Sequence, residues 1–189
     1  MNGGRSVLLL GCLLFVVVMT LACVPGQTDP NSELPGGPIS VSEEAALRLE
    51  KKVAEALQQG PSSQFNLKIS DEEMSSWLAL RAAKEPQAMI ADPRVRFTKG
   101  KIFAAVTVVG VLPFRIRVTL VSSAQVVNDR VQFEIQKSSA GPFPVPGFVL
   151  DALSQTINET LLEAQLDVQV MNIEILESEI LLTGRIRTG

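Results

Sequence analysis

Several residue types that commonly carry out catalysis are absent from most of this chain. The sequence has no histidine and no tyrosine, and its only cysteines, Cys12 and Cys23, lie near its start. Beyond Cys23 the chain cannot form a Ser-His-Asp triad, a Cys-His pair or the usual Cys/His zinc site. Adjacent acids from Asp71 to Glu73 precede a helical pattern, where the helix dipole favours acids. The sequence predicts a protein that is not an enzyme and uses no metal or cofactor; a carboxylate pair formed by folding is the alternative.

Cys23 is the residue with the clearest predicted chemistry. Arg5 precedes a largely apolar stretch over residues 7–22, which suits an export signal better than a membrane span of roughly 20 residues. The segment Thr20-Leu21-Ala22-Cys23 resembles the bacterial lipobox, although an aliphatic residue is usual where Thr20 stands. We expect a signal peptide over residues 1–22 and lipid attachment at Cys23, on the extracytoplasmic face of the cell membrane. A secreted protein cut by an ordinary signal peptidase and an uncleaved N-terminal anchor are the alternatives.

The sequence after the leader divides into a tether and a domain. Residues 23–39 are rich in proline and glycine, so they predict a lipid-anchored tether without a core of its own. Residues 40–189 suffice for one domain that buries a sizeable core. The net charge is −3, from 17 basic and 20 acidic residues, and basic runs are absent. Nucleic acid is therefore not expected as a partner.

Apolar periodicity predicts an α+β domain. Helices are expected over residues 40–59, 70–85 and 148–164, the first two opening with capping boxes at Ser40–Glu43 and Ser70–Glu73. Alternating patterns predict a short strand over 65–69, consecutive antiparallel strands over 94–136 and a hairpin over 166–187. A change of phase near Val170 and Met171 predicts a β-bulge. The expected fold is a strongly curved antiparallel sheet, a meander plus a C-terminal hairpin, packed on a long amphipathic helix with two helices on its N-terminal side.

The strand over residues 101–109 is apolar on both faces. Phe103, Ala105 and Val109 share one face, and apolar character continues through Leu112 and Phe114. A central strand covered on both sides gives this pattern. The alternative is that this face lines a groove for an acyl chain, in which the small Ala105 leaves room.

Aromatic residues elsewhere are further candidates for contact with an apolar ligand. Phe143 and Phe148 flank a proline-stiffened loop that either packs beneath the third helix or dips into lipid headgroups. Trp77, the only tryptophan, is expected in the core or at the mouth of the groove.

Arginines lie on the same predicted strands. Arg115 and Arg117 project from one face of their strand, and they lie near Arg94 and Lys99 if neighbouring strands pair. Solvated arginines on a strand give this pattern, and contact with anionic headgroups is the alternative.

The order of several motifs resembles that of a known family. The motifs are the strand-to-helix segment 69–77 (ISDEEMSSW), Asp92-Pro93-Arg94-Val95, the turn Lys99-Gly100-Lys101, residues 141–146 (GPFPVP) and Leu182-Thr183-Gly184. Over residues 62–184 this order is similar to YpmS-type membrane-anchored extracytoplasmic bacterial proteins. More distantly it resembles LmeA-type phospholipid-binding proteins, which are compared with tubular lipid-binding domains. The resemblance implies a non-enzymatic domain, a curved sheet around a long helix and a bound lipid, and it supplies no active-site residue. The lipobox-like leader departs from the plain membrane anchor of that family.

The sequence therefore predicts a membrane-anchored extracytoplasmic lipoprotein that is not an enzyme. Its expected partners are the membrane, through the lipid on Cys23, and a phospholipid or other apolar ligand of the cell envelope. The alternative is a tethered protein-interaction module in envelope or cell-wall assembly that has no ligand cavity. The candidate ligand contacts are Trp77, Phe103, Ala105, Val109, Leu112, Phe114, Phe143 and Phe148.

Overall fold

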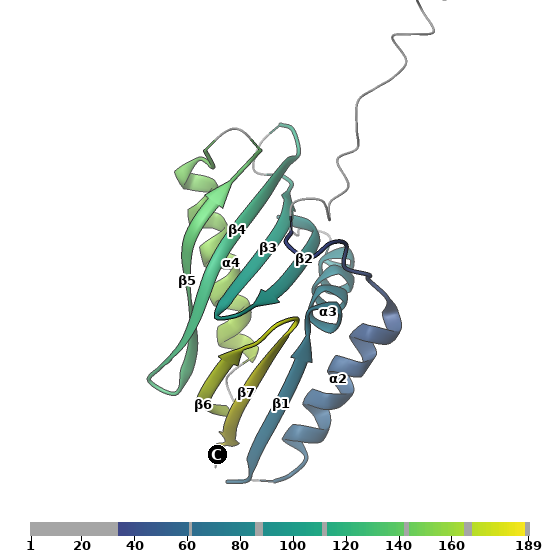
Figure 1. Cartoon of the computed structure of the whole chain (residues 1–189), viewed down its shortest axis with the longest axis vertical. Coiled ribbons are helices and arrows are strands. Elements are labelled where there is room, and N and C mark those ends of the chain that lie inside the picture. The colour runs from purple at the N-terminus through teal and green to yellow at the C-terminus, as the bar shows by residue number, and fades with distance from the viewer. Residues whose placement is uncertain are drawn as a thin grey trace, which may run out of the picture.

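The computed structural model describes residues 34–187 apart from 61, 86–88, 111–112, 142–143 and 165–167. Within this part of the chain three helices and two antiparallel sheets form an α+β fold (Figure 1). In chain order the elements are α2 (Glu43–Leu57), β1 (Gln64–Ser70), α3 (Asp71–Lys84), β2 (Ile90–Thr98), β3 (Lys101–Val108), β4 (Ile116–Val127), β5 (Arg130–Ser139), α4 (Gly147–Ala164), β6 (Val168–Ile175) and β7 (Glu179–Ile186).

The strands form two sheets where the sequence pattern predicts one. The predicted meander is confirmed as a four-stranded sheet in the order β2-β3-β4-β5, whereas β1, β7 and β6 form a separate three-stranded sheet. After β5, α4 runs back along the meander, and the hairpin of β6 and β7 then pairs with β1 instead of extending the meander (Figure 1). The longest helix of the described part, α4, has 18 residues. A single curved sheet on a long helix is therefore not confirmed.

Serine caps begin the two N-terminal helices. The predicted capping box of α3 is confirmed, since the Glu73 N–H donates to Ser70 Oγ and the Ser70 N–H donates to the Glu73 carboxylate. The predicted box at Ser40 is wrong by two residues. Ser42 is the N-cap of α2 and accepts the Ala45 N–H at 3.1 Å. The N–H of Ser42 also donates to Ser76 Oγ of α3 at 3.1 Å, which ties the start of α2 to α3.

The irregularities of the strands follow from local sequence. The β4–β5 turn places both Asn128 and Asp129 at positive φ, the conformation of a two-residue hairpin that these residue types tolerate. The predicted bulge in β6 is confirmed, because the register with β7 shifts between Val170 and Asn172. The shift buries Val170 and leaves Met171 half exposed, so the two neighbours keep opposite environments.

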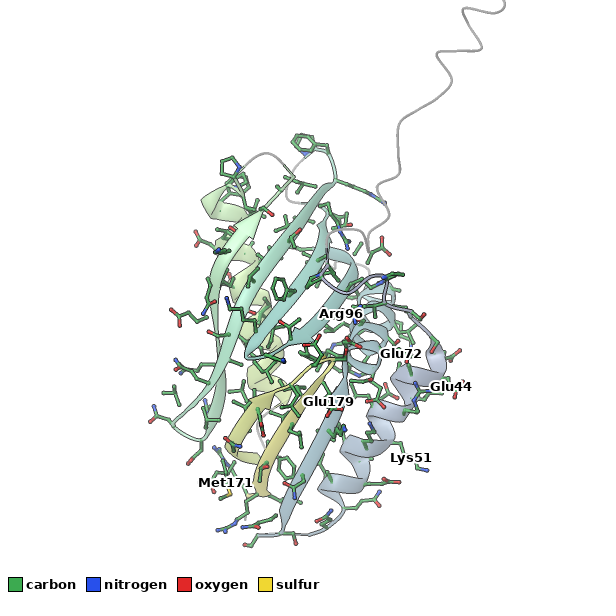
Figure 2. All side chains as sticks on the ribbon, in the orientation of Figure 1. Glu44, Lys51, Glu72, Arg96, Met171 and Glu179 are labelled. Carbon is green, nitrogen blue, oxygen red and sulfur yellow. The ribbon has the colours of Figure 1, made fainter. Side chains whose placement is uncertain are left out.

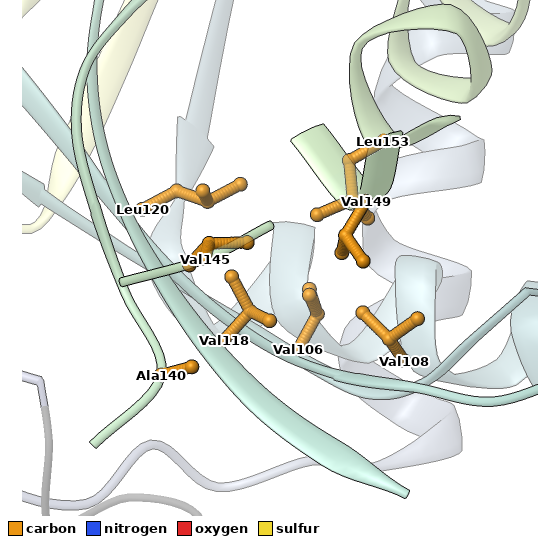
Figure 3. Close-up of a cluster of buried hydrophobic side chains, with 8 residues drawn as sticks. All are labelled: Val106, Val108, Val118, Leu120, Ala140, Val145, Val149 and Leu153. Atoms are coloured by element: carbon orange, nitrogen blue, oxygen red, sulfur yellow. The ribbon is translucent and has the colours of Figure 1, made fainter. Parts of the chain in front are cut away.

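The core lies on the inner face of the four-stranded sheet. One cluster joins β3 and β4 to the start of α4, and Figure 3 shows Val149 and Leu153 of the helix above Val106, Val108 and Val118 of the strands. A second cluster joins both sheets to α2 and α3. Each fully buried aliphatic side chain of this kind stabilises a fold by about 1.5–3 kcal/mol.

Residues 34–40, called the strap below, cross the opposite, outer face of the four-stranded sheet. The strap lies in front of β2 and β3 in Figure 1, whereas α4 lies behind the sheet. Its two large apolar residues, Leu34 and Ile39, are each only 5 % exposed. Part of the segment that composition assigns to the tether therefore packs against the domain.

Candidate functional site

The outer face of β3 is filled by the strap at the place where an apolar groove was considered. Ala105 has no exposed surface, and it packs with Leu34 and Ile39 in a small cluster that Phe103 borders. Both faces of β3 are thus covered at this point, one by the core and one by the protein's own strap. An acyl chain could reach Ala105 along this face only in place of the strap.

Arg96 holds the strap to the sheet. Its Nη2 donates to the Gly37 carbonyl at 2.8 Å, and its Nη1 donates to Asp71 Oδ2 at 2.8 Å. Figure 2 labels Arg96 where the strap crosses the sheet. The strap bends through Gly36 and Gly37, which both have positive φ and therefore suit glycine. Burial raises the pKa of the Asp71 carboxyl, and the charge of Arg96 opposes this rise.

Glu73 is the second buried acid at the start of α3. It accepts a 2.8 Å hydrogen bond from Lys52 Nζ of α2 and another from the Ser70 N–H. Arg48 Nε lies 3.7 Å from its Oε1. Burial alone would raise its pKa, but Lys52, Ser70 and Arg48 together lower it. Each buried acid thus has cationic and hydrogen-bonding partners of its own, which gives Asp71 and Glu73 structural roles in tying α3 to its neighbours.

Exposed apolar side chains gather at one end of the four-stranded sheet, called the phenylalanine end below. Phe114, just before β4, is 62 % exposed, Phe148 in the first turn of α4 is 53 % exposed, and Met89 before β2 is 38 % exposed. They share this end because Val109 donates to the Met89 carbonyl, Val108 pairs with Ile116, and Val149 packs on Val108 (Figure 3). Figure 1 likewise places the starts of β4 and α4 at the same end of the molecule.

Trp77 lies in a different place, between α2 and α3. One part of its ring packs on the second core cluster, and the Arg81 guanidinium lies over the ring, 5.3 Å from its centroid. Another part lines an open groove of about 290 Å³ between the two helices. The groove is lined by Glu43, Ala46, Leu47, Glu50, Trp77, Leu80, Arg81, Lys84 and Glu85. Its acidic and basic rim makes it a mixed surface and not an acyl-chain pocket.

The predicted ligand contacts therefore do not form one site. Phe114, Phe148 and the half-buried Val109 lie at the phenylalanine end, whereas Ala105 lies under the strap with Phe103 at its border, and Trp77 lies in the α2–α3 groove. Cys23, Leu112 and Phe143 lie outside the described residues. Sequence reasoning did not select Met89, Leu34, Ile39 or Arg96. A signal for the strap did exist in Leu34 and Ile39, the two large apolar residues that bracket its glycines and prolines.

Within the part of the chain that the structure describes, no three acidic side chains are grouped so that they could hold a metal ion. Among the described helices, none combines the length and the apolar character that a membrane crossing needs.

Comparison with known proteins adds no assignment. No protein-family model matches the chain, and no curated protein matches it.

Proposed function

We propose that this protein is a non-enzymatic lipoprotein of the cell envelope that is anchored through Cys23 on the extracytoplasmic side and contacts lipid with its phenylalanine end. The observation that carries the proposal is the exposure of Phe114 and Phe148 on neighbouring connections at one end of the sheet. Apolar residues that cluster on a surface mark interaction sites more often than single exposed ones do. Burying the two phenylalanines in lipid would contribute about 1.5–3 kcal/mol each.

The position of the strap supports a lipid surface as the partner. Ten residues, 24–33, separate Cys23 from Leu34. A chain of this length reaches about 35–40 Å when fully extended, so an acylated Cys23 would keep the domain within that distance of the membrane. At such a high effective concentration a contact of a few kcal/mol is enough to hold the domain on the surface for much of the time.

A tryptophan reporter tests the proposal. Trp77 is the only tryptophan, so a Trp77→Phe background allows one indole to be placed at will. Phe114→Trp puts it at the phenylalanine end, and Met171→Trp puts it on β6, where Met171 is also half exposed (Figure 2). The full chain is reconstituted in vesicles whose acyl chains carry bromine, a short-range quencher.

The proposal expects quenching of the indole introduced by Phe114→Trp and little quenching of the one introduced by Met171→Trp. Equal quenching at both positions would indicate general proximity without a defined contact, and no quenching at either would indicate a domain held off the membrane. Either of these results contradicts the proposal.

A protein-interaction module is the second candidate, and the α2–α3 groove favours it. The exposed Leu47 and the Trp77 ring offer apolar contact there, and the rim offers charges of both signs, a composition suited to a protein partner. A photo-crosslinker placed at Leu47 in cells separates the two candidates. Defined protein adducts, together with an unquenched indole at the phenylalanine end, would favour the interaction module.

A further inference from the structure

We infer that the outer face of the four-stranded sheet next to Phe114 binds the anionic headgroups of a phospholipid surface. This rests on the proposed function and deepens it, because it assigns the class of lipid that the phenylalanine end contacts. The inference uses the arginines of β2 and β4 and the strap that covers the same face.

Strand register brings basic residues together on the outer face. Arg94 pairs with Ala105, and Arg117 pairs with Thr107, so the two arginines flank β3 on the face that the strap crosses. Arg117 donates from Nη1 to the Asp92 carbonyl and to Thr107 Oγ1, which holds its guanidinium against the sheet. These hydrogen bonds fix a positive charge close to the phenylalanine end.

Two further cations extend this basic surface. Arg115 stands next to Phe114 in the sequence and is exposed. Lys137 of β5 is exposed as well and pairs with Val121, which pairs in turn with Phe103, so Lys137 shares the outer face. Two exposed acidic residues accompany them: Asp92 of β2, and Glu134 of β5, which pairs with Ser123 and so shares the outer face.

The buried Arg96–Asp71 pair lies beside the strap on this face, whereas the exposed ion pairs lie elsewhere. Figure 2 places Glu44 and Glu72 on the helical side and Glu179 in the three-stranded sheet. Arg48 pairs with Glu44 and Glu72, and Lys68 pairs with Glu179. The protein is acidic overall, with a net charge of −3, yet its outer face beside Phe114 is basic. This segregation of charge is complementary to an anionic surface.

The position of the tether indicates that the anionic surface is a membrane. The strap begins with Leu34, which packs on Ala105 of this same face, so the tether predicted from the sequence joins the domain on the basic side of the sheet. Guanidinium groups bind phosphate oxygens through a planar fork of N–H donors. Each Lys or Arg near an anionic leaflet raises the ratio of membrane-docked to free domain, called the docked-to-free ratio below, by about five-fold. Phenylalanines in the acyl region and arginines at the phosphates can act together in this geometry.

The test uses the same reporter in two kinds of vesicle. The full chain carrying Trp77→Phe and Phe114→Trp is reconstituted in brominated phosphatidylcholine alone or in the same lipid with about one third phosphatidylglycerol. Arg115→Gln removes an exposed charge beside the reporter, and Arg130→Gln removes an exposed charge from the distant β4–β5 turn as a matched control. Far-UV circular dichroism is used to check that both variants are folded.

The inference expects stronger quenching in the anionic vesicles and a weaker effect as salt is raised. It also expects Arg115→Gln to reduce the docked-to-free ratio about five-fold in anionic vesicles only, while Arg130→Gln has no effect. Equal quenching in both vesicles would overturn the inference and leave the proposed function standing. No quenching in either vesicle would overturn both.

Discussion

Arg96 and Asp71 form a buried ion pair in which Nη1 and Oδ2 lie 2.8 Å apart and each side chain is only 11 % exposed. Asp71 is the first residue of α3, and Arg96 lies on β2. The other terminal nitrogen of Arg96 donates to Gly37 in the strap. One ion pair therefore joins a helix and a strand to the segment that leads toward the N-terminus, and it positions the strap on the outer face.

Removing the positive partner of this pair should destabilise the fold strongly. Arg96→Met leaves the Asp71 carboxylate buried without its cation, and breaking a buried pair in this way costs about 3–5 kcal/mol. Urea unfolding of the full chain measures the loss. Arg130→Met, at an exposed turn, is the control and should change the free energy of unfolding by less than about 0.5 kcal/mol. A loss for Arg96→Met no larger than that of the control would refute the structural role of the pair.

Glu73 should make the fold sensitive to acid. Burial opposes its ionised form, but the hydrogen bond from Lys52, the Ser70 N–H and the nearby cations prevail and lower its pKa. A carboxyl with a lowered pKa stabilises the fold above its ordinary value of 4.5, and that stabilisation is lost as pH falls through the folded pKa. Glu73→Gln should therefore lose less stability than the wild type on acidification, as measured by urea midpoints across this range.

Asp71 should affect the pH dependence of stability in the direction opposite to Glu73. Burial raises its pKa above the ordinary 3.8, so the folded state binds the proton more tightly than the unfolded state does. Its contribution to stability accordingly declines as pH rises from 3.8 through the folded pKa. Asp71→Asn should steepen the loss of stability on acidification, whereas Glu73→Gln makes it shallower. If both variants shift the profile in the same direction, the environments assigned to these two acids are wrong.

Gly184 should not tolerate a side chain. A Cβ at this position would lie 2.5 Å from Phe65 Cζ and 2.6 Å from the Gln169 carbonyl oxygen, and the latter is backbone that cannot move alone. Gly184→Ala should cost about 1–3 kcal/mol in urea unfolding. Gly147→Ala is the matched control, because a Cβ there meets nothing within 4 Å and the residue begins α4. Equal stability of the two variants would contradict the close approach of β1, β6 and β7.

Ala105→Phe distinguishes a filled outer face from an open groove. Ala105 is completely buried against Leu34 and Ile39, so a larger side chain should displace the strap and destabilise the domain by about 1–3 kcal/mol. Limited proteolysis should then show faster cleavage within residues 34–40. Unchanged stability and unchanged cleavage would show that the face has room for a ligand beside the strap.

Local features of the fold were predictable because short motifs specify them. The capping box at Ser70 and Glu73 depends on residues three positions apart, and the bulge after Val170 follows from the phase of its own strand. Ser40 and Ser42 both precede acids, so the local sequence does not tell which of them is the N-cap, whereas in the structure Ser42 caps α2 and also contacts Ser76 of α3.

Pairing between distant segments was not predictable from periodicity. Leu67 of β1 pairs with Leu182 of β7, although most of the domain's sequence lies between them, and no local pattern indicates that partner. The strap was hidden for a similar reason. Its composition is that of a linker, and the burial of Leu34 depends on the space above Ala105, which exists only once β2 and β3 have paired.

The candidate site was predictable in its residue types and not in its layout. Phe114 and Phe148 were selected as apolar residues in connections, and the structure brings them to one exposed end. Trp77 and Ala105 were selected by similar reasoning but lie in separate surroundings, because apolar character alone does not tell a core residue from a contact residue.

Photo-crosslinking in living cells tests the central claim most directly. A benzoylphenylalanine replaces Phe148 in one full-length variant and Met171 in another, two positions of similar exposure at opposite ends of the described domain. After irradiation, intact-protein mass spectrometry measures phospholipid adducts on each variant. The proposed function predicts phospholipid adducts for the variant at Phe148 and none above background for the variant at Met171. Adducts of equal yield at both positions, or none at Phe148, would contradict it.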